Sequence, residues 1–518
     1  MTYRIGVDVG GTHTDAALLD PQLNCLATAK VRTTPDVMRG IEQAIATVLD
    51  SPLSVPREQI GLAMLGTTHC TNALVERQHL QRVGLLRLAA PATLAIPPQA
   101  GWPQDLVAAV PLKYAIVCGG YEYDGRVLAE LDEQEIRAAL RSWRGEIDAV
   151  AVCGVFSPIS GKQEAQAAQW VRDELGSGIA VTLSSEIGSV GLLERENAAI
   201  LNAALGVVAR RAIGGFRDAL SQAGLGHARS YLGQNDGTLM SLELAESYPI
   251  MTLGCGPTNS LRGAAFLSGL KDALVVDVGG TTSDIGALID GFPRESASAV
   301  EIGGARLNLR MPDILAIGVG GGTIVRAMGD AVTLGPDSVG YKLNEMAQIF
   351  GGDTLTLTDV ATAVEAMPAL APHPVRSPLA FCQQAYAVMV ERIEEGIDRM
   401  KVGSAGVPVV LVGGGSLLLP DALQGTSEVI RPPHFGAANA IGVAIAEISG
   451  EIDQIVQVPQ GERDTTLAAL RSRVLAQAVE AGAQPNAVRI IAEEVTPLAY
   501  LPGNACRVRL KAAGPLVC

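Results

Sequence analysis

The chain has 518 residues, of which 48% are apolar and 18% are charged, with 54 acidic and 39 basic residues and a formal net charge of −15. This length predicts several domains rather than one. The acidic balance and the absence of Lys/Arg runs argue against a nucleic-acid or anionic-membrane surface, and no uninterrupted apolar stretch reaches the roughly 18 residues that a membrane-spanning helix needs. We therefore expect a soluble globular protein with a small-molecule partner.

The N-terminal part, residues 1–180, is predicted to be an α/β lobe. No apolar segment typical of a secretion signal follows Met1, so a cytoplasmic location is expected. Apolar runs alternate with helical periodicity, which predicts strands and helices in alternation. The expected strands are Ile5–Val9, Ala16–Leu19, Leu62–Gly66 and Ala149–Phe156, and a helix is expected at Val37–Leu49.

Residues 181–450 are predicted to form a second lobe, and residues 451–518 a small α+β appendage. A long alanine-rich helix is expected at 196–223, leading into the second lobe. In the appendage we expect a helix at 465–481 and strands at 488–492 and 506–510. The eight cysteines include no Cys-x-x-Cys pair, so neither a zinc ribbon nor a disulfide scaffold is indicated.

One motif occurs twice in the chain. Val7–Thr12 and Val276–Thr281 both read VDVGGT, and the similarity extends beyond each copy. The matched positions are Asp8, Gly10, Gly11, Thr12 and Asp15 in the first copy, and Asp277, Gly279, Gly280, Thr281 and Asp284 in the second. Each copy has an apolar run, a Gly-Gly-Thr turn and a second apolar run, which predicts a β-hairpin.

These hairpins have the composition of phosphate-binding turns. Glycines let backbone N–H groups approach an anion, a threonine hydroxyl adds a donor, and an aspartate on the preceding strand suits a phosphate-bound Mg²⁺. A single Gly-Gly turn could equally be a tight hairpin without function. Two copies favour a nucleotide held between two related lobes.

A third glycine turn follows the apolar run Val407–Val412. Gly413, Gly414 and Gly415 would let the backbone lie flat against an adenine or a ribose. Taken alone, this turn is weak evidence for a nucleotide site.

The order and separation of these three elements resemble the actin, sugar-kinase and Hsp70 ATPase superfamily. More narrowly, the chain resembles the A-type (ATP-binding) subunit of the hydantoinase/oxoprolinase family. The narrower resemblance rests on GTTHCTNALVER at 66–77, LLEREN at 192–197, QNDG at 234–237, CGPTNSLRGAA at 255–265, AIGVGGGTIVR at 316–326, LGPDSVG at 334–340 and LTLTDV at 355–360.

The resemblance implies a two-lobed, actin-like (ribonuclease H-like) α/β ATPase fold with duplicated lobes. It also implies ATP-dependent hydrolysis of a cyclic amide, such as a hydantoin, 5-oxoproline or a lactam, through phosphorylation of the carbonyl oxygen. The cofactors would be ATP and Mg²⁺. Because no B-type half follows in this sequence, the implied partner is a separate B-type subunit in a homo- or hetero-oligomer.

Each motif residue has an expected role. Asp8 and Asp277 would hold Mg²⁺ or orient a nucleophile, and His13 is a candidate acid or base, although a loop histidine can also be a structural hydrogen bonder. The expected phosphate ligands are Gly10, Gly11, Thr12, Thr14, Gly279, Gly280, Thr281 and Thr282; the adenosine ligands are Gly413, Gly414 and Gly415; and the substrate contacts are Thr67, Thr68, His69 and Asn72.

Two other functions remain open at this level. A small-molecule kinase of the same superfamily would release a stable phosphorylated product. A non-catalytic ATP sensor would bind ATP and close its lobes around a partner without turnover. The two alternatives share the expected fold, because function depends on the site rather than on the fold.

Overall fold

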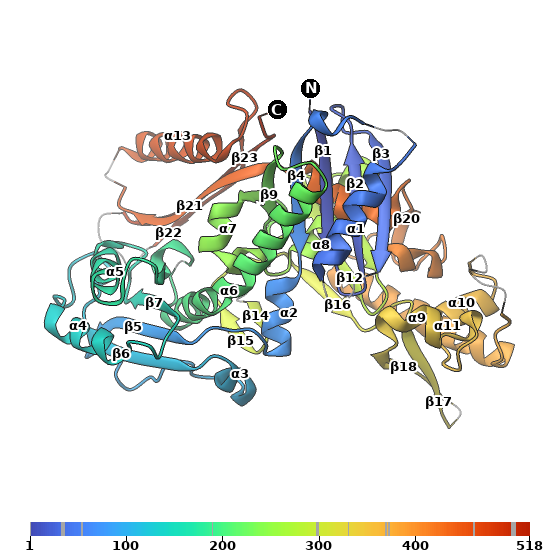
Figure 1. The fold of residues 1–518 in the computed structure, drawn as a ribbon, viewed down its shortest axis with the longest axis horizontal. Helices are drawn as coiled ribbons and strands as arrows, with labels where there is room; N and C mark the ends of the chain where they lie inside the picture. Colours follow the sequence, from blue (N-terminus) through green and yellow to red (C-terminus); the bar gives the residue numbers. More distant parts are fainter. Residues whose placement is uncertain are drawn as a thin grey trace.

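Two mixed β-sheets, with a pair of helices packed between them, form the centre of the molecule (Figure 1). The computed structural model describes residues 2–32, 37–52, 55–188, 190–296, 300–329, 331–367, 370, 373–458, 461–498 and 504–517. The expected two-lobed α/β fold is confirmed.

The larger sheet has nine strands and is assembled from distant parts of the chain. In spatial order its strands are β22 (Arg489–Pro497), β23 (Cys506–Gly514), β21 (Ile448–Val456), β10 (Leu239–Ser241), β9 (Arg229–Gly233), β4 (Ile60–Thr67), β1 (Tyr3–Val9), β2 (His13–Leu19) and β3 (Cys25–Arg32). Helices α1 (Val37–Leu49), α6 (Leu192–Gln222) and α7 (Leu242–Ser247) cover one face of its β1–β4 end, where Ile41, Ile45 and Phe216 are fully buried.

The second sheet has six strands and repeats the local arrangement around β1. Its path is β13 (Phe292–Pro293), β12 (Ser283–Ile289), β11 (Ala273–Val278), β19 (Val407–Val412) and β20 (Thr426–Ile430), with β16 (Ile314–Ile317) paired to β12. Side chains alternate along β11, because successive residues of a strand point to opposite faces. Val276 therefore packs with α11 (Leu379–Met400) and α10 (Leu357–Ala363), whereas Val275 packs with α8 (Cys255–Ser268).

Helices α8 and α12 (Ala438–Ile445) lie between the two sheets and pack against each other at glycines. A Cβ atom on Gly263 would lie 1.9 Å from the carbonyl oxygen of Ala438, and one on Gly442 would lie 1.9 Å from that of Asn259. Larger residues at either glycine would separate the helices. This close approach brings side chains of both helices to the ends of β1 and β11.

A third, all-parallel sheet forms a separate layer on the N-terminal side of α6 (Figure 1). Its order is β6 (Leu112–Cys118), β5 (Val83–Ala90), β7 (Ala149–Gly154) and β8 (Ala180–Leu183), with α4 (Glu133–Ser142) and α5 (Lys162–Leu175) packed on one face. Helix α6 covers the opposite face. By length and composition α6 could span a membrane, but 72% of its apolar window is buried inside the protein, as expected of a core helix.

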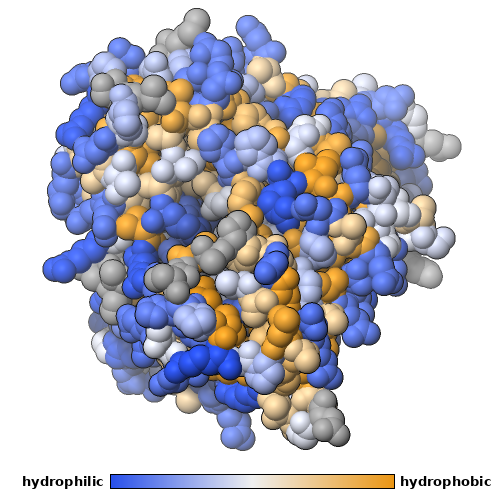
Figure 2. All heavy atoms as spheres, turned by 90° about the vertical axis from the view of Figure 1, so that its right-hand side faces the viewer, coloured by the Kyte–Doolittle hydropathy of each residue, from blue (hydrophilic) through white to orange (hydrophobic). Residues whose placement is uncertain are grey.

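The remaining elements are short, apart from one C-terminal helix. They are α2 (His69–Glu76), α3 (Gln104–Ala109), α9 (Leu343–Met346), α13 (Arg463–Ala481), the ribbon β14 (Val300–Ile302) with β15 (Ala305–Leu307), and the ribbon β17 (Thr323–Met328) with β18 (Ala331–Ser338). Figure 2 shows the face that carries the β17–β18 side of the molecule, where hydrophilic side chains cover most of the rim and hydrophobic ones gather nearer the middle.

Strand pairing crosses the expected limits of the segments. Strands β9 and β10 come from the expected second lobe, and β21, β22 and β23 come largely from the expected appendage, yet all five lie in the sheet that begins with β1. Residues 451–518 do combine helix α13 with strands. The expected domain boundaries at residues 180 and 450 stay predictions. The nine-stranded sheet takes strands from all three of the expected segments.

Candidate nucleotide site

The two VDVGGT copies form the expected hairpins, and they do so in the same register. Asp8 lies opposite Asp15 on β1 and β2, and Asp277 lies opposite Asp284 on β11 and β12. In each turn the first glycine donates its N–H to a carbonyl three residues later, Gly10 to His13 and Gly279 to Thr282, both at 2.9 Å. A parallel strand flanks each hairpin, β4 beside β1 and β19 beside β11.

The glycine turns of the two hairpins approach each other. A Cβ atom on Gly280 would lie 3.4 Å from Cγ2 and 3.5 Å from Oγ1 of Thr12. Gly11 and both turn threonines of the second copy, Thr281 and Thr282, are exposed, while Gly10, Thr12, Gly279 and Gly280 are partly buried. The backbone of both turns is therefore accessible where the lobes meet.

Thr14 is placed differently from the other expected phosphate ligands. Its side chain is fully buried, and a Cβ atom on Gly40 of α1 would lie 3.0 Å from its hydroxyl oxygen. Thr14 thus faces α1, because alternation along β2 turns it away from the side of His13 and Asp15. The matching residue of the second hairpin, Ser283, is buried as well and donates to the carbonyl of Val319 at 2.6 Å.

Asp8 is buried and held by amides from both central helices. Its Oδ1 accepts from Nδ2 of Asn259 on α8 at 2.9 Å, and its Oδ2 accepts from Nδ2 of Asn439 on α12 at 3.0 Å. Burial raises the pKa of Asp8 to about 7, with a smaller contribution from Asp15, while the two amides oppose the rise. A cation bound here would favour the ionised form.

The same Asn439 amide also serves Asp15. Its Nδ2 donates to Oδ2 of Asp15 at 2.9 Å, and Nζ of Lys30 on β3 lies 2.8 Å from Oδ1 of that carboxylate. One amide therefore joins two neighbouring carboxylates of the first hairpin. This fixes both side chains relative to α12.

Asp277 occupies the corresponding place in the second lobe. Burial raises its pKa, opposed by a hydrogen bond with Ser260 and by the charge of Lys30. A Cβ atom on Gly413 would lie 2.2 Å from Oδ1 of Asp277, and one on Gly66 would lie 2.1 Å from Oδ1 of Asp8. A glycine on the neighbouring parallel strand or loop thus leaves space for each aspartate. Burial and the nearby Asp277 also raise the pKa of Asp284 to about 7.

The third glycine turn follows β19 and continues into a 3₁₀ helix, Gly414–Leu418. Gly413 has a φ of +81°, a conformation that favours glycine. A Cβ atom on Gly415 would lie 2.7 Å from Cγ1 of Val278, so this turn packs directly on the end of β11. Nη2 of Arg431 donates to the carbonyls of Ser416 and Leu419, both at 3.0 Å, and holds the 3₁₀ helix in place.

The expected substrate residues lie beside the first hairpin, where β4 passes into α2. Oγ1 of Thr68 donates to the carbonyl of Val9 at 3.1 Å, and Nδ2 of Asn72 reaches Oγ1 of Thr68 at 3.4 Å. Thr67 is buried, its hydroxyl is hydrogen-bonded to Nδ1 of His69, and its N–H lies 3.4 Å from Sγ of Cys255. This group is therefore continuous with the end of β1.

Both singled-out histidines have lowered pKa values. Burial lowers the pKa of His69. Burial and the nearby charge of Lys30 lower that of His13, whose Nδ1 lies 3.2 Å from Oγ1 of Thr12. Each ring is thus favoured in its neutral form, in which one nitrogen can accept a proton.

The donor chemistry around the hairpins fits a hard cation. Among the described residues no three His, Cys, Asp or Glu side chains form a group that could hold a metal ion by themselves. Asp8 and Asp277 nevertheless offer carboxylate oxygens at the ends of β1 and β11. Mg²⁺ is typically bound by one or two carboxylates together with phosphate oxygens and water, so this donor set suits a metal that arrives with a nucleotide.

Three residues of this site escaped the motif analysis: Lys30, Asn259 and Asn439. Asn259 lies inside CGPTNSLRGAA, and Asn439 lies in the segment PPHFGAANAIG, so the segments could have directed attention to them. Lys30 reaches Asp15 from the neighbouring strand, 15 positions along the chain, whereas the contacts of Asn259 and Asn439 with Asp8 and Asp15 join residues hundreds of positions apart. No local spacing reveals such contacts.

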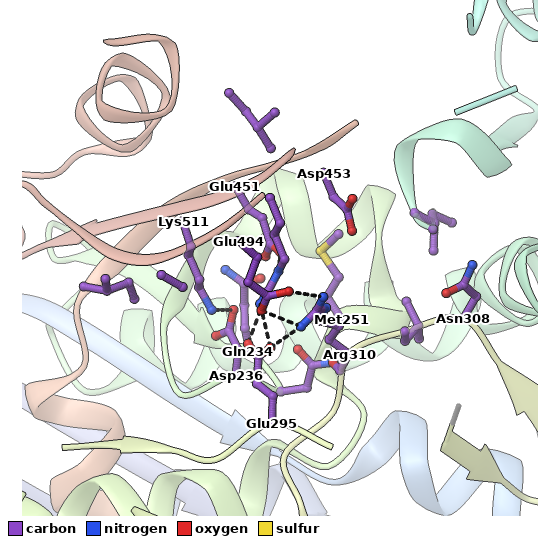
Figure 3. Close-up of a pocket in the computed structure, with 18 of the residues that line it drawn as sticks. Gln234, Asp236, Met251, Glu295, Asn308, Arg310, Glu451, Asp453, Glu494 and Lys511 are labelled. Atoms are coloured by element: carbon purple, nitrogen blue, oxygen red, sulfur yellow. Dashed lines mark hydrogen bonds and ion pairs between the residues drawn. The ribbon is translucent and has the colours of Figure 1, made fainter. Parts of the chain in front are cut away.

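A cavity of about 1190 Å³ lies beside the C-terminal strands (Figure 3). Gln234, Asn235 and Asp236 of the QNDG motif form part of its wall. Oγ1 of Thr258 donates to the carbonyl of Asn235 at 2.9 Å, and the next residue of α8 is Asn259. One turn of α8 therefore connects this cavity with the amide that holds Asp8.

The charges that line the cavity are largely paired with one another. Arg509 on β23 is 3% exposed and lies 2.7 Å from Glu295, 2.7 Å from Glu451 and 3.3 Å from Glu494. Arg310 also pairs with Glu295 and Glu494 (Figure 3). These ion pairs connect β21, β22 and β23 to the segments that follow β13 and β15.

Asp236 pairs with Lys511 across the same cavity (Figure 3). Burial alone would raise the pKa of Asp236, but Lys511 and the hydrogen bonds from Thr238 hold it below its usual range. The QNDG motif thus anchors β23 to the β9–β10 turn.

Comparison with known families matches two successive regions of the chain. The hydantoinase/oxoprolinase N-terminal region matches residues 4–175, and the hydantoinase/oxoprolinase model matches residues 195–370. Together these regions contain both hairpins and every quoted segment from GTTHCTNALVER to LTLTDV except LLEREN, which begins three residues before the second region.

Two curated relatives and one solved structure show the extent of the similarity. The chain is 28% identical over 388 residues to the acetophenone carboxylase gamma subunit of Aromatoleum aromaticum, covering 68% of this chain and 52% of that protein. It is 26% identical over 382 residues to caprolactamase subunit alpha of Pseudomonas jessenii, covering 70% and 54%. The alignments thus span about half the length of these relatives.

The crystal structure of the ATP-dependent caprolactamase from Pseudomonas jessenii superimposes with a TM-score of 0.77 at 20% sequence identity, covering 98% of this chain and 87% of that one. At this identity the match establishes the fold.

Proposed function

Because the chain belongs to the hydantoinase/oxoprolinase family, we propose that it uses ATP to phosphorylate the carbonyl oxygen of a cyclic amide and so prepares the ring for hydrolysis. The observation that carries this proposal is the pair of VDVGGT hairpins, which present Asp8 and Asp277 in matching register and bring their glycine turns together. The relatives that match the chain include a caprolactamase subunit, and the solved caprolactamase is described as ATP-dependent.

The reaction consists of a transfer and a ring opening. The amide oxygen forms a bond to the γ-phosphorus of ATP, the bond from that phosphorus to the β-phosphate oxygen breaks, and ADP leaves. Water then attacks the activated carbon and the ring C–N bond breaks, with the nitrogen taking a proton, which leaves an acyl phosphate. A second water hydrolyses the acyl phosphate to a carboxylate and releases phosphate. Amide resonance opposes direct attack by water, and phosphorylation removes this resistance.

The residues of the site have distinct parts in the transfer. Backbone groups of the turns at Gly11 and Gly280 would bind the phosphates, since glycine permits close approach. Asp8 and Asp277 would hold Mg²⁺, which when bound neutralises charge on the transferred phosphoryl group. Asn259 and Asn439 keep Asp8 in place by hydrogen bonds to both of its oxygens.

The substrate would bind near Thr67, Thr68, His69 and Asn72. This placement is supported by the hydrogen bond from Thr68 to the carbonyl of Val9 at the end of β1, which sets the group next to the first hairpin. The neutral form of His69 that burial favours could accept a proton there. His13 has the same capacity at the hairpin turn.

A second subunit is part of the proposal. Matching relatives are named as alpha, beta or gamma subunits of larger enzymes. We assign the phosphorylation step to this chain and the completion of hydrolysis to a separate B-type subunit.

The test is ADP formation by the purified chain with Mg-ATP and 5-oxoproline, hydantoins or simple lactams, with and without a B-type subunit. Substrate-stimulated ADP formation that is lost in Asp8→Ala would support the proposal. A stable phosphorylated product released by the chain alone would favour a kinase, and ATP binding with no turnover under any of these conditions would favour a sensor.

A further inference from the structure

We propose that Lys30 is a phosphate-binding residue of the nucleotide site; this inference rests on the proposed use of ATP. Strand pairing places Lys30 in a row with the hairpin aspartates. Asp8 of β1 lies opposite Asp15 of β2, and Asp15 lies opposite Lys30 of β3. Residues opposite one another on neighbouring strands project from the same face of a sheet. Lys30 therefore lies on the face that carries Asp8.

Lys30 also reaches the second-lobe side of the site. Its Nζ donates to the carbonyl of Gly436 at 3.3 Å, just before α12, and a Cβ atom on Gly414 would lie 3.7 Å from its Cε. The charge of Lys30 acts on both His13 in the first hairpin and Asp277 in the second. A polyphosphate held between the hairpin turns would lie close to this ammonium group.

The charge balance of the site favours such a role. The two hairpins carry Asp8, Asp15, Asp277 and Asp284, and the phosphates of a nucleotide would add further negative charge. The Lys30 side chain is 42% exposed, so its ammonium group is accessible to a bound phosphate, while its buried partner Asp15 also accepts from Asn439. An ammonium group on a flexible stem binds phosphate as a point charge.

The experiment compares binding of Mg-ATP, Mg-ADP and adenosine to the full-length chain and to Lys30→Met and Lys30→Arg, by isothermal titration calorimetry. The control is Lys113→Met on β6 of the all-parallel sheet. Its partner Glu146, in the turn between α4 and β7, lies 2.6 Å away, and both side chains are about half exposed. Thermal unfolding without nucleotide checks that each variant is folded.

We expect Lys30→Met to weaken Mg-ATP binding about 10- to 100-fold, because a hydrogen bond to a charged group is lost, and to leave adenosine binding unchanged. Lys30→Arg should retain most of the affinity, and Lys113→Met all of it. If Lys30→Met binds Mg-ATP with unchanged affinity, or loses as much affinity for adenosine as for Mg-ATP, the inference about Lys30 is wrong while the proposed use of ATP stands. Failure of the wild-type chain to bind Mg-ATP overturns the proposed function as well.

Discussion

Thr12 and Gly280 meet at the turns of the two hairpins, where a Cβ atom on the glycine would lie 3.4 Å from the threonine methyl carbon. Both turns come from copies of one motif. The two lobes therefore present the same hairpin turn to each other where they meet. Asp8 and Asp277 stand four and three residues before this contact.

Replacing Asp8 by asparagine should stabilise the nucleotide-free protein at pH 8 and abolish substrate-stimulated ADP formation. The pKa of Asp8 rises from 3.8 to about 7 on folding, chiefly through burial. Between about pH 4 and pH 7 the folded state therefore binds a proton that the unfolded state releases, and stability falls as pH rises. The rise corresponds to at most about 4 kcal/mol above pH 7.

Denaturant unfolding of both proteins at pH 5 and pH 8 measures this effect. The stability difference between the two pH values should be smaller in Asp8→Asn than in the wild-type protein. A slope will remain, because Asp284 also has its pKa raised to about 7. An identical pH slope in both proteins would contradict the prediction.

Asn439→Ala should lower the stability by about 1–3 kcal/mol and the rate of ADP formation by about 10- to 100-fold. The substitution removes the one amide that donates to both Asp8 and Asp15, leaving two close carboxylates without a shared donor. Thermal unfolding and steady-state kinetics measure the two effects. Asn24→Ala, which removes an exposed hydrogen bond to Asp20, is the matched control. Equal changes of stability and rate in the two variants would contradict the role of Asn439 in holding Asp8 and Asp15.

Gly413→Ala should disrupt the second lobe, whereas Gly414→Ala should preserve its stability. At Gly413 the new methyl group would lie 2.2 Å from Oδ1 of Asp277, and the φ of +81° is unfavourable for alanine. At Gly414 the nearest atom is Cε of Lys30 at 3.7 Å, an ordinary contact. Melting temperatures of the two variants test this difference. An equal decrease in both would argue against a requirement for glycine beside Asp277.

Arg509→Met should destabilise the protein by on the order of 3 kcal/mol, because it leaves Glu295, Glu451 and Glu494 crowded around an apolar side chain. Arg471→Met removes an exposed pair with Glu493 and should cost less than about 1 kcal/mol. Chemical denaturation at neutral pH measures the free energy of unfolding of both variants. Similar losses of stability would show that Arg509 contributes no more than an exposed ion pair.

Local patterns were enough to predict much of the secondary structure. The helix expected at Val37–Leu49 has those bounds, and both hairpins form around their glycine turns. The order of strands in the nine-stranded sheet could not be predicted, because pairing of β10 with β21 depends on contacts between segments far apart in the chain.

The site was predictable where the chemistry is carried by a motif. The repeated aspartates and glycines were found, since their spacing is local. Alternation along β2 could also have shown that Thr14 points away from His13. The partners Asn259, Asn439 and Lys30 could not be found in this way, because a single amide or lysine gains its meaning only from the fold around it.

The nine-stranded sheet has a consequence for how the chain acquires its structure. Its strands from β1 to β10 are made first and β21, β22 and β23 last, with the entire six-stranded sheet synthesised in between. Until those late strands emerge from the ribosome, β10 has an open edge next to a completed neighbour. Such long-range pairing is slow to form, so the newly made chain must keep this edge from pairing with other molecules during synthesis.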